Sequence, residues 1–170
     1  IHRDLKPENI IYDPRTQRTR LLDFGHARDA DTPPEERLTR TGFFVGTLQY
    51  VAPEALSGAL VDEAADIYSL ATIAFLLLSG QLPYSAKSPR ELFHQLLTRP
   101  PLRLSEARRD LPFPKALEDV VARGLHREPA RRQASVICFS DDFGAAAAEP
   151  APGPRAGIIG SLKGMFGSGQ

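Results

Sequence analysis

The sequence predicts a mainly α-helical fold that contains one short β-hairpin. Two observations carry this prediction. Apolar residues recur at helical spacing in several segments between positions 62 and 143, and two short apolar runs near the start are separated by a polar turn. The 170 residues are on the scale of a single domain. They carry 21 basic and 21 acidic side chains, so we expect no nucleic-acid partner.

The hairpin is expected to join Ile10–Tyr12 to Arg20–Leu22. The segment between these runs begins with an Asp-Pro pair, which favours a turn. Such a hairpin would bring Asn9 and Asp23, which flank its two strands, into one small volume. Their side-chain oxygens could then bind the same metal ion.

Four helices are expected in the second part of the chain. The first contains the apolar run Ile67–Leu78, which is too short to span a bilayer and is therefore expected to be a buried core helix. A second helix is opened by Ser88 and Pro89. A third covers residues 115–126, and a fourth follows Pro129 and includes Val136, Ile137 and Phe139.

Three segments are expected to lack regular structure. Residues 25–53 are polar and rich in turn formers, which predicts an extended mobile loop. Residues 144–157 are an Ala, Pro and Gly mixture that is typical of a linker. Residues 158–167 place apolar side chains on one helical face, but three glycines weaken a helix there, so we expect residues 158–170 to be a disordered tail. A tail that docks on a membrane or a partner is the alternative.

Three motifs occur in a fixed order: HRDLKPEN at His2–Asn9, LLDFG at Leu21–Gly25 and YVAPE at Tyr50–Glu54. With them, the chain resembles the eukaryotic-like (Hanks-type) serine/threonine protein kinases, in the style of bacterial signalling kinases. The resemblance covers residues 1–143 and implies the large, C-terminal lobe of a kinase domain, mainly α-helical with a short hairpin. The Gly-rich loop and strand lysine that kinases carry earlier are not in this sequence, so we expect the small lobe to be absent.

The resemblance implies roles for four residues near the start. Asp4 would accept the proton of the substrate hydroxyl, and Lys6 would steady the transferred phosphoryl group and so help to bind ATP. Asn9 and Asp23 match the positions that hold the metal bound to ATP, which is Mg²⁺ with Mn²⁺ as an alternative. The implied function is transfer of the γ-phosphate of ATP to serine or threonine hydroxyls of a protein substrate.

The resemblance also implies roles in the loop before the APE motif. Thr47 would position the substrate residue, while Thr39 and Thr41 would be phosphorylated. Arg3 could pair with a phosphothreonine through charge-assisted hydrogen bonds. The alternative is that Thr39 and Thr41 are solvated loop residues without a regulatory role.

Further motif residues are expected to be structural. Glu54 and Arg132 resemble the ion pair that ties the end of this loop to the last helices, and Asp66 resembles the helix acid that holds the catalytic-loop backbone. The single Cys138 excludes an internal disulfide and suits a reducing compartment, so we expect a cytoplasmic location.

Two functions from different classes stay open at this point. The first is an active serine/threonine kinase, although this segment alone, without the small lobe, is expected to be inactive. The second is a truncated, non-catalytic module that binds or docks partners. The coding sequence upstream of Ile1 would distinguish them, because a Gly-rich loop and a strand lysine encoded there would favour the kinase.

Overall fold

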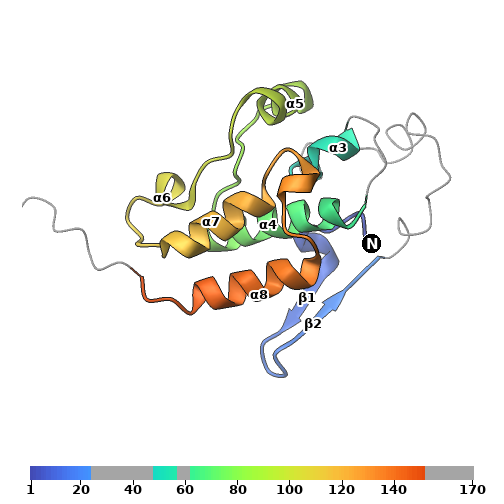
Figure 1. Ribbon diagram of the computed structural model, residues 1–170. Coiled ribbons are helices and arrows are strands. Elements are labelled where there is room, and N and C mark those ends of the chain that lie inside the picture. The colour runs from blue at the N-terminus through green and yellow to red at the C-terminus, as the bar shows by residue number, and fades with distance from the viewer. Residues whose placement is uncertain (24–47, 57–61, 152–170) are drawn as a thin grey trace, which may run out of the picture.

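The computed structural model of the protein describes residues 1–23, 48–56 and 62–151. Within these ranges helices dominate and the sheet has two strands, which confirms the predicted class (Figure 1). Residues 25–47 of the loop expected over residues 25–53 lie outside these ranges. The expected tail, residues 158–170, also lies outside them. The described elements are η1 (Pro7–Asn9), β1 (Ile10–Asp13), β2 (Arg18–Leu21), α3 (Pro53–Leu56), α4 (Glu63–Ser79), α5 (Pro89–Thr98), α6 (Leu104–Ala107), α7 (Lys115–Gly124), η3 (Pro129–Arg131) and α8 (Val136–Ala147).

The expected hairpin is present, formed by β1 and β2 in antiparallel pairing with Ile10 opposite Leu21. The pairing continues one step further, because the Leu22 backbone N–H donates to the Asn9 carbonyl at 2.8 Å. At the other end of the hairpin, Asp13 accepts hydrogen bonds from the Thr16 hydroxyl and the Arg15 backbone, and these bonds lower the pKa of the Asp13 carboxyl. The hairpin therefore holds the chain before β1 beside the chain after β2.

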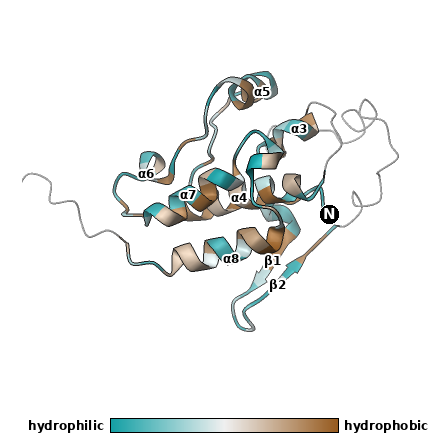
Figure 2. Ribbon diagram, viewed as in Figure 1, coloured by the Kyte–Doolittle hydropathy of each residue, from teal (hydrophilic) through white to brown (hydrophobic). Residues whose placement is uncertain are grey.

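The central element is α4, which confirms the predicted buried helix. It begins where the Asp62 carboxylate accepts the Ala64 backbone N–H, and it ends at Gly80, whose φ of 71° lies in the left-handed region that favours glycine. Aromatic and aliphatic side chains are buried on most of its circumference, as expected for a helix enclosed by other elements. Figures 1 and 2 show α7 and α8 lying along it, and both contact it.

The helix expected after Pro129 is present as α8, but it does not start at the proline. Pro129–Arg131 forms only a single 3-10 turn, and α8 starts at Val136 after the Ser135 hydroxyl accepts the Cys138 backbone N–H. The helix then continues through Ala147, into the segment that was expected to be a linker from residue 144. Alanine has the highest helix propensity, and Ala146 is buried in the core, so the composition of this stretch extends the helix.

None of the helices in the described part of the chain has the length and apolar character that a membrane span requires.

One close approach fixes how α4, α7 and α8 pack. A Cβ atom placed on Gly124 of α7 would lie 2.7 Å from the Ala71 Cβ on α4 and 3.0 Å from the Phe139 ring on α8. Real Cβ atoms do not approach so closely, and Ala71 is fully buried, so neither helix has room to yield. The three helices can meet here only because residue 124 has no side chain.

We expect Gly124→Ala to destabilise the protein by about 1 to 3 kcal/mol, because the added methyl overpacks this crossing. Gly144→Ala is the matched control, since a Cβ added to Gly144 in α8 would have no neighbouring atom within 4 Å. That substitution should be neutral or stabilise by up to about 1 kcal/mol through helix propensity. Urea unfolding of both variants measures the difference. Equal stabilities would show that the crossing tolerates a side chain.

Candidate active site

The residues at the start of the chain are fixed to α4 by one buried carboxylate. Asp66, 5% exposed, accepts the backbone N–H of His2 at 2.6 Å with Oδ2 and that of Arg3 at 2.8 Å with Oδ1. Hydrogen bonds to an ionised acceptor are stronger than neutral ones. They help to offset the strain at Arg3, whose φ of 69° is unfavourable for a side-chain-bearing residue.

The His2 ring joins the loop at the start of the chain, residues 1–6, to the end of the hairpin. Its Nδ1 accepts the backbone N–H of Asp4 at 3.3 Å, and its Nε2 lies 3.0 Å from the Leu22 carbonyl oxygen. Because Nδ1 accepts, Nε2 must carry the proton and donate it, so we assign the neutral Nε2–H tautomer. The buried ring therefore positions the backbone of both Asp4 and the residue before Asp23.

Asp4, Lys6 and Asn9 form one bonded set. The Asp4 Oδ2 atom accepts the Asn9 Nδ2 at 2.9 Å and lies 2.9 Å from the Lys6 Nζ. The same Asn9 amide also donates to the Asp4 carbonyl oxygen at 2.8 Å. The side chains of Asp4 and Lys6 are 17% and 20% exposed, so both are shielded but neither is fully buried.

The hairpin pairs Leu22, the residue before Asp23, with Asn9. The Asn9 amide nitrogen is committed to Asp4, which leaves its oxygen Oδ1 as an available ligand. A carboxylate and an amide oxygen fit Mg²⁺, which is usually held by few protein oxygens together with phosphate and water. The described residues hold no group of three His, Cys, Asp or Glu side chains that would suggest an all-protein metal cage.

A small pocket lies between the loop at the start of the chain, α4 and the segment before α3. It is lined in part by Arg3, Asp4, Tyr50 and Ser69. The Ser69 hydroxyl donates to the Tyr50 carbonyl at 2.8 Å and so fixes that segment on α4. The Nε of Arg3 is buried and has no hydrogen-bond partner within the described residues.

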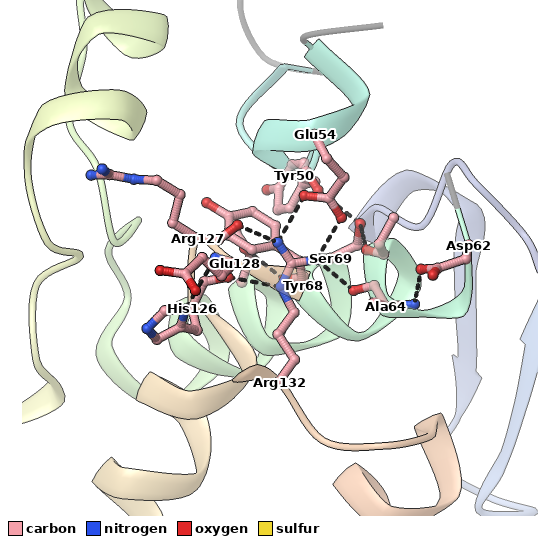
Figure 3. A network of polar contacts seen from close by, with 12 residues as sticks. Tyr50, Glu54, Asp62, Ala64, Tyr68, Ser69, His126, Arg127, Glu128 and Arg132 are labelled. Atoms are coloured by element: carbon pink, nitrogen blue, oxygen red, sulfur yellow. Dashed lines mark hydrogen bonds and ion pairs between the residues drawn. The ribbon is translucent and has the colours of Figure 1, made fainter. Parts of the chain in front are cut away.

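A buried ion pair connects α3 to the loop before α8 (Figure 3). The Arg132 guanidinium, whose side chain is fully buried, contacts both carboxylate oxygens of Glu54 at 2.6 and 2.8 Å. Its remaining N–H groups donate to backbone carbonyls of Ala64, His126 and Arg127, so all five donors are used. The guanidinium carbon also lies 5.0 Å from the centre of the Tyr68 ring, and burial raises the pKa of that tyrosine.

The structure thus brings together most of the residues that the sequence singled out. Thr39, Thr41 and Thr47 lie outside the described residues. Sequence reasoning missed Ser69 and Tyr68, which appeared only as polar interruptions of an apolar helix. Their spacing gave no signal for the partners they contact, because those partners come from distant parts of the chain.

Comparison with known proteins agrees with this geometry. A family model for the protein kinase domain matches residues 1–143. The chain is 36% identical over 147 residues to serine/threonine-protein kinase pkn3 of Myxococcus xanthus, and 42% identical over 131 residues to serine/threonine-protein kinase PknD of Mycobacterium tuberculosis. These alignments cover 84% and 77% of this chain but only 27% and 19% of the relatives, so the chain spans a minor part of their length.

The fold agrees as well. A crystal structure of the PknI kinase domain of Mycobacterium tuberculosis superposes with a TM-score of 0.58 at 33% identity. The match covers 86% of this chain and 47% of that one.

We expect Arg132→Met to destabilise the protein by about 3 to 5 kcal/mol, because the Glu54 carboxylate would lose its guanidinium while remaining shielded from water. Arg131→Met is the matched control. Arg131 is exposed and pairs with exposed Glu128, so its loss should cost less than about 1 kcal/mol.

Adding Glu54→Met to the Arg132→Met variant should recover part of the lost stability, because the buried carboxylate that has lost its guanidinium is then removed. Thermal and urea unfolding of the variants measure these differences. If Arg132→Met lost no more stability than Arg131→Met, the buried pair would have no structural role.

Proposed function

Because this chain belongs to the protein kinase family, we propose that it forms the catalytic loop and substrate side of a serine/threonine kinase. In the full-length protein this kinase transfers the γ-phosphate of ATP to hydroxyl groups of a protein substrate. The family uses ATP with a divalent metal, and we infer Mg²⁺ here. The observation that carries the proposal is the bonded set of Asp4, Lys6 and Asn9, together with the pairing of Asn9 with Leu22, the residue before Asp23.

In this function Asp4 supplies the carboxylate that accepts a hydrogen bond from the substrate hydroxyl and takes its proton as the new O–P bond forms. The bond from the γ-phosphorus to the bridging oxygen breaks, and ADP leaves. Asn9 holds the Asp4 carboxylate in place through Nδ2. Lys6, 2.9 Å from that carboxylate, places a positive charge where the transferred phosphoryl group gains negative charge.

Asn9 and Asp23 would hold the Mg²⁺ that neutralises the ATP phosphates. For Asn9 the ligand would be Oδ1, since its nitrogen is engaged by Asp4. The hydrogen bonds from the loop to Asp66 keep Asp4 at a fixed position relative to α4. Most of the catalytic effect in such a site comes from positioning and charge, so a rigid loop is what the reaction requires.

We further propose that Thr47 positions the substrate residue and that Thr39 or Thr41 is phosphorylated. The buried Nε of Arg3, which has no partner within the described residues, supports a role for this guanidinium in binding an anionic group. We infer a cytoplasmic location, because a free cysteine at exposed Cys138 suits a reducing compartment. The alternative of a non-catalytic docking module has less support, since the catalytic side chains are present and mutually bonded.

We expect Asp4→Asn in the full-length protein to lower phosphotransfer by at least about 100-fold, because the carboxylate that takes the proton is lost while the shape is kept. Asp13→Asn is the matched control, since this carboxylate lies at the exposed end of the hairpin. It should leave the rate unchanged. Initial rates with labelled ATP and a serine-containing peptide, together with circular dichroism, test both variants. A rate for Asp4→Asn near that of the unsubstituted protein would contradict the assignment.

We expect the active full-length protein to carry phosphate on Thr39 or Thr41, and Arg3→Ala to reduce the activation that this phosphate gives. Peptide mass spectrometry before and after phosphatase treatment locates the modification. An active preparation in which both threonines are unmodified would overturn this part of the proposal.

A further inference from the structure

The hydroxyl of Ser69 makes its shortest hydrogen bond outside its own helix. A buried serine in a helix commonly donates to the carbonyl four residues earlier, and the Ser69 hydroxyl does lie 3.1 Å from the Ala65 carbonyl oxygen. Its shorter contact, at 2.8 Å, is to the carbonyl oxygen of Tyr50, 19 residues earlier. Figure 3 shows both residues in the polar network that also contains Glu54 and Arg132. Ser69 and Tyr50 are both buried, so water has little access to this bond.

The same turn of α4 carries the carboxylate that holds the loop at the start of the chain. Asp66 precedes Ser69 by three residues, and side chains at this spacing lie on one face of a helix. Asp66 accepts two consecutive backbone N–H groups of the loop, while Ser69 donates to Tyr50. Both side chains line the small pocket together with Asp4. One helical turn therefore sets where Asp4 lies relative to segment 48–52.

Segment 48–52 lies against the residues that surround the reacting carboxylate. Tyr50 belongs to the same buried apolar cluster as Leu5, the neighbour of Asp4. Val51 is partly exposed and lines the pocket beside Asp4. A substrate chain whose hydroxyl reached Asp4 would therefore contact this segment.

The Tyr50 carbonyl depends on Ser69 for its hydrogen bond. Among the described residues no other group donates to this oxygen. A buried carbonyl that loses its donor is costly, so a chain without the Ser69 hydroxyl would gain by moving the Tyr50 backbone toward water. Apolar packing of the Tyr50 ring would still hold the side chain, but it has no fixed direction for the backbone.

We propose that Ser69 is a positioning residue for the protein substrate. Its hydroxyl fixes the Tyr50 backbone, and thereby the surface of segment 48–52 on which the substrate chain lies, at a set distance from Asp4. Ser69 acts through Tyr50 and does not itself touch the substrate. The inference rests on the proposed kinase function for its effect on the reaction, whereas the attachment of segment 48–52 to α4 can be measured without catalysis.

The first test is steady-state kinetics of the full-length protein with ATP and a serine-containing peptide. Ser69→Ala should raise KM for the peptide by about three- to tenfold, because one hydrogen bond to a buried carbonyl is lost. KM for ATP should stay unchanged, because the bonded set of Asp4, Lys6 and Asn9 keeps all of its contacts. A general loss of stability would not raise one KM and leave the other as it was.

Ser79→Ala is the matched control. Ser79 is a second buried serine of α4, and its hydroxyl bonds only Phe75 and Gln81 at the other end of the helix. This substitution should leave both KM values unchanged. Ser69→Thr keeps the hydroxyl and adds a methyl group beside the pocket, so its KM for the peptide should stay close to that of the unsubstituted protein.

Three results would overturn the proposal. The first is a peptide KM for Ser69→Ala equal to that of the unsubstituted protein. The second is an equal rise for Ser79→Ala, because the effect would then follow from a weakened helix. The third is an equal rise for Ser69→Thr, because the size of the side chain would then matter and the hydroxyl would not.

The second test needs no catalysis. Hydrogen–deuterium exchange of the full-length protein, followed by mass spectrometry, measures how often segment 48–52 opens. Ser69→Ala should speed exchange of its amides by about three- to tenfold, and Ser79→Ala should not. Unchanged exchange in Ser69→Ala would overturn the proposal. If the unsubstituted protein phosphorylates no peptide, the kinase proposal fails, and the exchange rates still decide whether Ser69 holds the segment.

Discussion

The buried carboxylate of Asp66 is the contact on which the arrangement of the active loop depends. A charged group that is 5% exposed is costly unless it is well bonded, and here both oxygens accept backbone N–H groups of the loop. These N–H groups belong to consecutive residues, so the loop is held in position and in direction. The position of Asp4 then follows from the covalent chain, and Lys6 and Asn9 complete the site from within the next five residues.

A second buried charge performs a comparable task at longer range. Arg132 lies far from Glu54 in sequence, yet its guanidinium also bonds carbonyls on α4 and in the loop after α7. One side chain thus joins three elements, each through a bond with fixed direction. Because an arginine offers a planar set of donors, a lysine at this position could not satisfy the same partners. Helix α3 is therefore fixed to the helical core by polar contacts as well as by apolar packing.

Local patterns predicted the elements well, and contacts between elements less well. The hairpin, the buried helix and the Ser88 cap followed from turn residues, periodicity and a capping side chain. The start of α8 could not be located from Pro129, because that proline begins a short 3-10 turn and the true cap is Ser135. The candidate site residues were selected through their motifs. The bond from Ser69 to Tyr50 and the ring of Tyr68 below Arg132 depend on tertiary packing, which no local pattern encodes.

The pairing of Asn9 with Leu22, the residue before Asp23, is made at the open end of the hairpin, whereas the turn lies at the opposite end. Antiparallel strands can gain or lose residues in matched pairs at the turn without altering the pairs already formed at the open end. The turn is therefore a part of this lobe that can vary in length and composition between related sequences. A reporter group inserted there would be separated from the reacting atoms by the whole length of both strands.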